Sequence, residues 1–273
     1  MTQAGAIRRR ARRKHSVATR LWHWAMAAAI VILLASGLAI FNAHPRLYWG
    51  SVGTSAEPAW LEIGAREDAG YLKIGEQSFD TTGVLGLWHT SSGHRQYTAF
   101  PGAVTLPGPY ALADARRWHI MASWILILGW PVFIAVSLLN GHLLRDLMPR
   151  LWELSPRRLW RTCRDHMRLR PHDKARHGIY NVLQKLTYSG VLGVLLPLVV
   201  LSGLAMSPAI AAAWPWLLDM FGGRQSARTF HFIFASLFSL FLVIHLIMLL
   251  LYNPWRLMKD MILGGRREEE DPG

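Results

Sequence analysis

The chain has little cysteine and little charge. Cys163 is the only cysteine, which excludes an internal disulfide, a cysteine-ligated iron-sulfur cluster and a haem attached covalently through a CxxCH motif. Only 17% of the 273 residues are charged and 52% are hydrophobic, which is too apolar for an ordinary soluble domain of this length. A bilayer is therefore the expected environment, and any redox cofactor must be held without a covalent bond, through His or Met.

Four stretches lack charged side chains for long enough to span the hydrocarbon core of a membrane, which takes roughly 20 helical residues. They are residues 21–41, 118–140, 186–206 and 230–252, and the third helix is expected to begin earlier, near residue 182. The predicted fold is an all-α integral membrane protein, a bundle of four transmembrane helices that forms a single domain over residues 21–252. The first stretch is too long for the apolar core of a signal peptide and is expected to be retained as a helix.

The distribution of basic residues predicts the orientation. Residues 1–20 and the loop at 141–178 are strongly basic, whereas the loop at 42–115 mixes bases with acids. Because positively charged segments stay in the cytoplasm, both termini and the basic loop are expected there, and residues 253–273 form a cytoplasmic tail. The protein is thus predicted to be a multi-pass membrane protein, with residues 42–115 on the outside.

The formal net charge of +13 is also explained by the basic residues of the expected cytoplasmic segments. Nucleic-acid binding needs basic residues gathered on one folded face, whereas here they flank the apolar stretches. They are interpreted as topology signals that also contact anionic membrane lipid. No nucleic acid partner is expected.

The outer loop at residues 42–115 is rich in Gly, Pro and Trp. It is expected to be ordered but irregular, with short strands or an interfacial helix. Loops of this length are usually functional, and docking of an external partner is the predicted use.

Four histidines lie within the expected helices: His23, His119, His231 and His245. Ionisable side chains there are rare and usually functional. His231 and His245 are fourteen residues apart, which corresponds to about 21 Å along one helix and to faces within roughly 40° of each other. The predicted orientation pairs His119 with His231 near the outer surface and His23 with His245 near the cytoplasmic surface. Each pair is predicted to ligate one haem b, and a haem with two histidine ligands passes electrons and does not bind oxygen.

The sequence leaves three alternatives open. The protein could bind one haem instead of two, and His142 could replace one of the ligands of the inner haem. The protein could also be a transporter or anchor without haem, whose histidines relay protons. The other histidines are interpreted as ordinary surface residues; they are His15, His44, His89, His94, His166, His172 and His177.

Three of the four candidate ligands follow an arginine by three residues, in an Arg-x-aromatic-His pattern. Arg20, Arg116 and Arg228 would lie on the same helix side as their histidines and could bind haem propionates. The alternative is an ordinary arginine at a membrane interface. Gly37 and Gly203 are predicted to pack against haem, and they lie in similar sequences, Ala-Ser-Gly-Leu-Ala and Leu-Ser-Gly-Leu-Ala.

Several motifs give the chain a family resemblance. They are Leu-Trp-His-Trp at 21–24, Arg-Arg-Trp-His at 116–119, Tyr-Asn-Val-Leu-Gln-Lys at 180–185, Gly-Leu-Ala-Met-Ser-Pro at 203–208 and Phe-Gly-Gly-Arg-Gln-Ser-Ala-Arg at 221–228. With the fourteen-residue histidine spacing, they resemble the b-type cytochrome subunits of membrane-bound formate dehydrogenase and nickel-iron hydrogenase. The thiosulfate reductase cytochrome b branch is the most similar.

The resemblance implies a subunit with two haems b that relays electrons between the quinone pool and a periplasmic redox partner. For the thiosulfate reductase branch, that partner is a molybdopterin oxidoreductase acting on sulfur oxyanions or a related substrate. A free-standing quinone-linked cytochrome b oxidoreductase, such as a superoxide oxidase, is the alternative function. The long outer loop favours a docked partner.

The resemblance also implies a quinone site near the cytoplasmic haem. The candidate hydrogen-bonding residues are Asn181, Gln184, Lys185 and Tyr188, at the start of the third helix. The alternative is a polar helix end with a lysine that reaches the membrane surface.

Overall fold

The computed structural model describes residues 17–90, 92–141, 143, 148–149, 151–167, 182–251 and 254–265. The chain divides into two compact parts, one containing residues 1–28 and 240–273 and the other residues 29–239. The two parts are described separately below. Two long helices, α1 (Val17–Asn42) and α9 (Arg224–Leu251), contribute to both.

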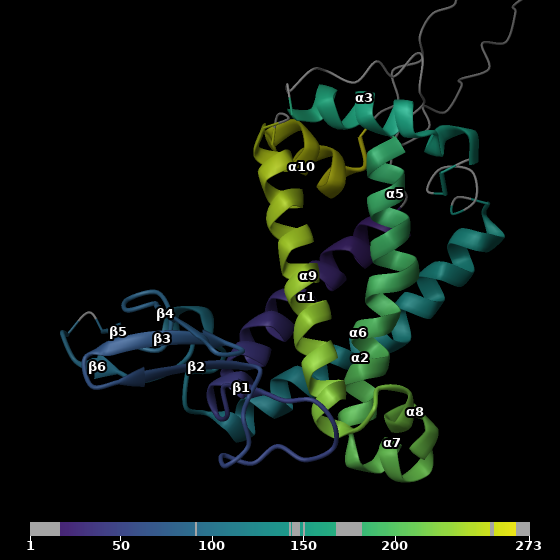
Figure 1. The fold of residues 1–273 in the computed structure, drawn as a ribbon. Coiled ribbons are helices and arrows are strands. Elements are labelled where there is room, and N and C mark those ends of the chain that lie inside the picture. Colours follow the sequence, from purple (N-terminus) through teal and green to yellow (C-terminus); the bar gives the residue numbers. More distant parts are fainter. Residues whose placement is uncertain are drawn as a thin grey trace, which may run out of the picture. The chain divides into compact units, whose positions relative to one another are not determined.

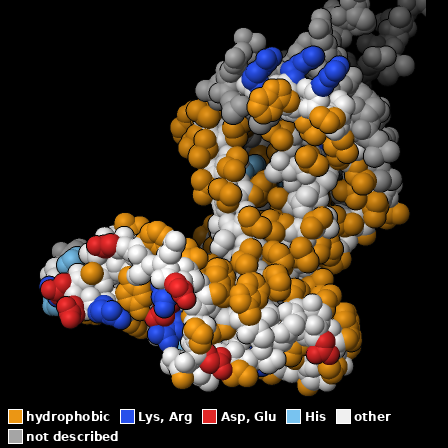
Figure 2. All heavy atoms as spheres, viewed as in Figure 1, with side chains coloured by type: hydrophobic (Ala, Val, Ile, Leu, Met, Phe, Trp, Pro, Cys, Tyr) orange, Lys and Arg blue, Asp and Glu red, His pale blue; other side chains and the backbone are white. Residues whose placement is uncertain are grey.

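Four candidate membrane-spanning helices are present, as the apolar stretches predict (Figure 1). They are α1, α2 (Leu112–Leu139), the continuous helix Val182–Met206, and α9, each of 25 to 28 residues. Large apolar side chains are exposed along them, and Figure 2 shows such side chains over the visible surface of the helices. Such a surface is stable in contact with lipid tails and would be costly in water.

The third spanning helix contains one wider turn. It consists of α5 (Val182–Gly190), the π-helical turn η4 (Val191–Leu195) and α6 (Leu196–Met206). In η4 each carbonyl accepts from the N–H five residues later, as the N–H of Leu196 donates to the carbonyl of Val191. The carbonyl of Leu192 would by this spacing accept from residue 197, but that residue is proline and has no N–H. The indole Nε1 of Trp130 on α2 donates to that carbonyl at 2.9 Å. A hydrogen bond between helices thus satisfies the carbonyl that proline leaves without a donor.

The segment at residues 42–115 contains regular strands. A four-stranded antiparallel sheet has the order β1-β2-β3-β4, and a second pair joins β5 to β6. The strands are β1 (Arg46–Leu47), β2 (Leu61–Arg66), β3 (Ala69–Ile74), β4 (Gln77–Asp80), β5 (Trp88–His89) and β6 (Arg95–Gln96), and the short helix η1 (Gly102–Val104) follows. Short strands were expected here and are present, so the all-α description does not extend to this segment. Tight two-residue turns between β2, β3 and β4 let alternating side chains pair across strands. The protein is mostly helical.

The segment that contains the four-stranded sheet packs against the beginning of α9. Phe41, Leu47 and Ile63 are buried in one cluster, against which Phe232 of α9 packs. The Phe41 and Phe232 rings stack with centroids 4.7 Å apart. Hydrogen bonds add to this contact: the Thr229 hydroxyl donates to the carbonyl of Tyr48 at 2.7 Å.

Two short helices, α7 (Pro208–Ala213) and α8 (Pro215–Met220), join α6 to α9. Leu217 of α8, Ala205 of α6 and Ala227 of α9 are buried in one cluster. The small side chains of the two alanines leave room for the leucine, so α6 and α9 are held together at this end.

Helices also occur in segments that were predicted as a loop and a tail. Within residues 141–178 the structure has the short helix η3 (Leu151–Leu154) and α3 (Pro156–Met167). Within residues 253–273 it has α10 (Pro254–Leu263).

Candidate functional site

Two of the predicted ligands face each other. The imidazole rings of His119 on α2 and His231 on α9 have centroids 6.2 Å apart and planes at 69°. A metal–imidazole nitrogen bond is about 2 Å long, and the ring centre lies about 1 Å beyond the nitrogen. Two imidazoles on opposite sides of one iron therefore have centroids roughly 6 Å apart. The observed spacing fits a single iron between the two rings.

Hydrogen bonds identify the nitrogen of His231 that is available to a metal. Its Nδ1 lies 3.0 Å from the carbonyl oxygen of Val199 and 3.1 Å from the hydroxyl of Ser202. A carbonyl can only accept, so Nδ1 carries the proton. Nε2 of the neutral ring is then unprotonated, which is the form that binds a metal.

His119 has a corresponding arrangement. Its Nδ1 lies 3.0 Å from the hydroxyl of Ser36, and that hydroxyl lies 2.6 Å from the carbonyl of Ile32. A hydroxyl has one proton, and Ser36 donates it to Ile32, so its oxygen accepts from Nδ1–H of His119. Nε2 of His119 is again left as the nitrogen for a metal.

Gly37 and Gly203 lie against these histidines. A Cβ atom at Gly37 would be 3.5 Å from Cε1 of His119, and one at Gly203 would be 3.3 Å from Cε1 of His231. The two glycines therefore make room for the imidazoles. Their predicted contact with haem itself stays a prediction.

Ser36 and Ser202 were not predicted as site residues. Both are fully buried, and each precedes the glycine that contacts the same histidine. In both Ser-Gly-Leu-Ala sequences the serine is hydrogen-bonded to a histidine of another helix, and the glycine contacts the same histidine. The repetition of this sequence was the signal that could have identified them.

The other predicted pair, His23 and His245, lies in the part of the chain that contains residues 1–28 and 240–273. Each has an aromatic neighbour: Trp24 for His23, with ring centroids 5.3 Å apart, and Phe241 for His245, at 5.9 Å. His142, the rival ligand, lies outside the described residues. The pairing of His23 with His245 stays a prediction.

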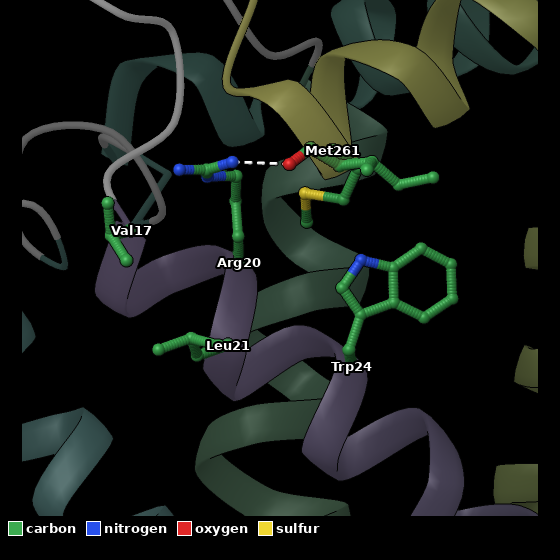
Figure 3. Close-up of a pocket in the computed structure, with 6 residues that line it drawn as sticks. Val17, Arg20, Leu21, Trp24 and Met261 are labelled. Carbon is green, nitrogen blue, oxygen red and sulfur yellow. Dashed lines mark hydrogen bonds between the residues drawn. The ribbon is translucent and has the colours of Figure 1, made fainter.

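The three predicted propionate-binding arginines differ in their surroundings. Arg20 donates to the carbonyl of Ile262 in the last turn of α10, beside a hollow lined also by Leu21, Trp24 and Met261 (Figure 3). Arg116 is exposed on α2. Arg228 is half-buried and donates to the backbone carbonyl of His44.

Of the predicted quinone residues, Asn181 lies outside the described residues. Gln184, Lys185 and Tyr188 are on α5. The Lys185 ammonium is buried and donates to both carboxylate oxygens of the buried Glu153, at 3.0 and 3.2 Å. Glu153 was not predicted, because it is 32 residues away in a segment that was expected to be a loop.

The sequence profile of the family described as prokaryotic cytochrome b561 matches residues 14–264. This chain belongs to that family. It is a membrane cytochrome that binds haem b and carries electrons as a subunit of an oxidoreductase. The expectation of a b-type membrane cytochrome is thereby confirmed.

The site fits this cofactor. Haem b needs nitrogen ligands, and the rings of His119 and His231, each with an unprotonated Nε2, lie at a centroid spacing suited to one iron. Among the described residues no group of three or more His, Cys, Asp and Glu side chains could hold a metal ion. Two facing histidines agree with iron held by a macrocycle.

One curated relative of the cytochrome is YedZ1 of Azospira oryzae, provisionally described as a subunit of a protein-methionine-sulfoxide reductase. The two are 29% identical over 168 residues, which is 59% of this chain and 79% of YedZ1. No solved structure matches the cytochrome.

Substitutions of the two glycines test the fit around the histidines. Gly203→Ala places a methyl group 3.3 Å from His231, which is tight, whereas Gly37→Ala meets His119 at an ordinary contact distance of 3.5 Å. We expect Gly203→Ala to displace His231, lower stability by about 1 kcal/mol and change the reduced haem absorbance. Gly37→Ala serves as the matched control and should resemble the unmodified protein. Identical spectra and melting temperatures for the two variants would contradict this geometry.

Proposed function

We propose that this cytochrome relays electrons between the quinone pool and a redox partner outside the membrane, through two haems b. The observation that carries the proposal is the facing pair of His119 and His231, each with its Nδ1 proton held by a buried serine. An arrangement that leaves both Nε2 atoms for one iron supports electron transfer more than substrate chemistry.

The residues of the pair have defined tasks. Haem b supplies one-electron redox chemistry when it is bound. His119 and His231 would hold the haem iron through their Nε2 atoms, and an iron with two histidine ligands would pass electrons rather than bind oxygen or a substrate. Ser36 and Ser202 fix the ring orientation and the tautomer, so that little rearrangement accompanies a change of charge.

We assign the second haem to His23 and His245. The helix α9 carries both His231 and His245, so it would supply one ligand to each haem. Electrons would then pass along this helix between the two membrane surfaces. This arrangement places both termini and the basic loop in the cytoplasm and residues 42–115 outside, in a bacterial inner membrane.

The external partner is proposed to be a periplasmic molybdopterin oxidoreductase. The sheet of the outer segment supports this proposal, because it is tied to α9 two residues before His231 through the Thr229–Tyr48 hydrogen bond. The relative described as a methionine-sulfoxide reductase subunit also supports it. A sulfoxide and a sulfur oxyanion both contain sulfur bonded to oxygen, so we propose that this cytochrome belongs with the thiosulfate reductase branch of the formate dehydrogenase and hydrogenase subunits.

Quinone is proposed to bind at α5, with Gln184 and Tyr188 as hydrogen-bonding residues and with Asn181. Lys185 has a different role in this proposal. Its buried ion pair with Glu153 joins α5 to the short helix before α3, and removing one partner would leave an uncompensated buried charge. Lys185 therefore holds the site together rather than contacting quinone.

Single histidine substitutions test the number of haems and their ligands. We expect the unmodified cytochrome to contain two haems per chain. Replacing His119 or His231 by Ala should remove one of them, and replacing His23 or His245 should remove the other, because each haem loses an axial bond. Haem content would be measured as the pyridine haemochrome, and redox titration would show which potential is lost. His89→Ala, in β5, is the matched control and should keep both haems.

A chain with one haem, or the loss of both haems in every variant that still folds, would overturn the assignment. Loss of the same potential in His119→Ala and His23→Ala would show that the pairs are wrong.

The quinone site is tested by haem reduction with a quinol. Gln184→Leu and Tyr188→Phe should each slow this reduction about tenfold, since each removes one hydrogen bond to the ligand. Reduction by dithionite should be unchanged, and Thr187→Val is the control on the same helix. Unchanged quinol kinetics in both variants would exclude this site. Lys185→Met should be examined only together with Glu153→Gln, because the single change costs about 3 kcal/mol or more of stability.

A further inference from the structure

The half-buried cation Arg228 lacks an acidic partner among the described residues. The ion pairs there join other side chains: Arg46 with Glu62, Arg95 with Asp68, Arg117 with Asp114, and Lys185 with Glu153. Arg228 donates one hydrogen bond to the backbone carbonyl of His44, and its guanidinium carbon lies 5.8 Å from the centre of the Phe41 ring. A guanidinium group has five N–H donors, so this cation has capacity for an anion.

Two side chains beside Arg228 also contribute buried polar atoms. Nε2 of His44 is buried and has no hydrogen-bond partner among the described residues. The buried hydroxyl of Tyr48 lies near Arg46, whose pKa it helps to raise. The two rings stack with centroids 5.7 Å apart, so these atoms belong to one cluster. Buried polar atoms without partners are uncommon in native proteins and mark a place where a ligand or water binds.

The charges around His44 also favour an anion. Burial, followed by the positive charges of Arg228 and Arg46, lowers the pKa of His44, and only Glu62 acts in the opposite direction. A carboxylate next to Arg228 would offset this positive field and raise the proton affinity of the imidazole. The cluster therefore has the donors and the charge of a carboxylate receptor.

The position of the cluster relates it to the histidine pair. Arg228 precedes His231 by three residues on α9, which is roughly 4.5 Å along the helix and on the same side. His44 follows the end of α1, the helix whose Ser36 holds His119. Both chain segments that approach the outer histidines thus contribute to the cluster.

We propose that Arg228, His44 and Tyr48 form the receptor for a propionate carboxylate of the haem held by His119 and His231, with His44 as a proton site linked to the oxidation state of that haem. The inference rests on the proposed function and extends it. Arg228 binds the carboxylate as a cation, Tyr48 donates a hydrogen bond, and His44 shares a proton with it. Reduction adds one negative charge to the haem, so His44 binds a proton more tightly in the reduced state.

The test is a redox titration of the complete haem-loaded protein between pH 5 and 8. The midpoint potential of the outer haem should fall as pH rises in the unmodified protein. In His44→Gln that dependence should be lost. Arg228→Gln should shift the reduction equilibrium roughly tenfold toward the oxidised form, because a nearby positive charge is removed. Arg117→Gln is the matched control, since Arg117 is exposed on α2 two residues before His119, and it should leave the potential nearly unchanged.

Resonance Raman spectra of the propionate bending mode provide a second measurement that does not depend on potentials. The mode should shift in Arg228→Lys and in Tyr48→Phe, which are conservative enough to keep the fold. If the potential, its pH dependence and the bending mode all match the unmodified protein while both haems are present, the cluster binds only water and the inference is wrong. If His119→Ala leaves the outer haem in place, the proposed function itself fails, and the two outcomes are thereby distinguished.

Discussion

The buried hydrogen bonds from Nδ1 of His119 and His231 to serine hydroxyls are the interaction on which the site depends. With the Val199 carbonyl, which also accepts from His231, these bonds fix one tautomer of each ring and leave both Nε2 atoms unprotonated, and the ring centroids lie 6.2 Å apart. In a low-dielectric interior such bonds are strong, and a histidine without one could rotate or bind its proton at the other nitrogen. The close approach of Gly203 contributes to this geometry, because a Cβ atom there would be only 3.3 Å from Cε1 of His231.

The same arrangement is built twice from unrelated parts of the chain. Ser36 and Gly37 on α1 hold the histidine of α2, and Ser202 and Gly203 on α6 hold the histidine of α9. Each helix pair therefore delivers one ligand, and the site forms where the two pairs meet. The four-stranded sheet contacts the beginning of α9 through Thr229 and the Phe41–Phe232 stack, close to His231 in the sequence.

The sequence predicted the features that depend on local composition. Apolar stretches located the four helices, and histidines within them located the candidate ligands. Features that depend on packing were not predictable. The partner of Ser36 is decided by the helix that packs beside α1, and the partner of Lys185 comes from a segment with no apolar periodicity. His44 was interpreted as a surface residue, because nothing in its neighbourhood shows that Nε2 would be buried beside Arg228.

The planes of the His119 and His231 rings cross at 69°, and a haem held between them, as proposed above, would have crossed imidazole planes. Crossed planes make two iron d orbitals nearly equal in energy, which gives a low-spin ferric haem a strongly anisotropic electron paramagnetic resonance signal. The most direct measurement is this spectrum for His245→Ala, in which only the outer haem should remain. A single low-spin signal of that anisotropic type is expected. A high-spin signal, or a low-spin signal typical of parallel imidazole planes, would contradict it.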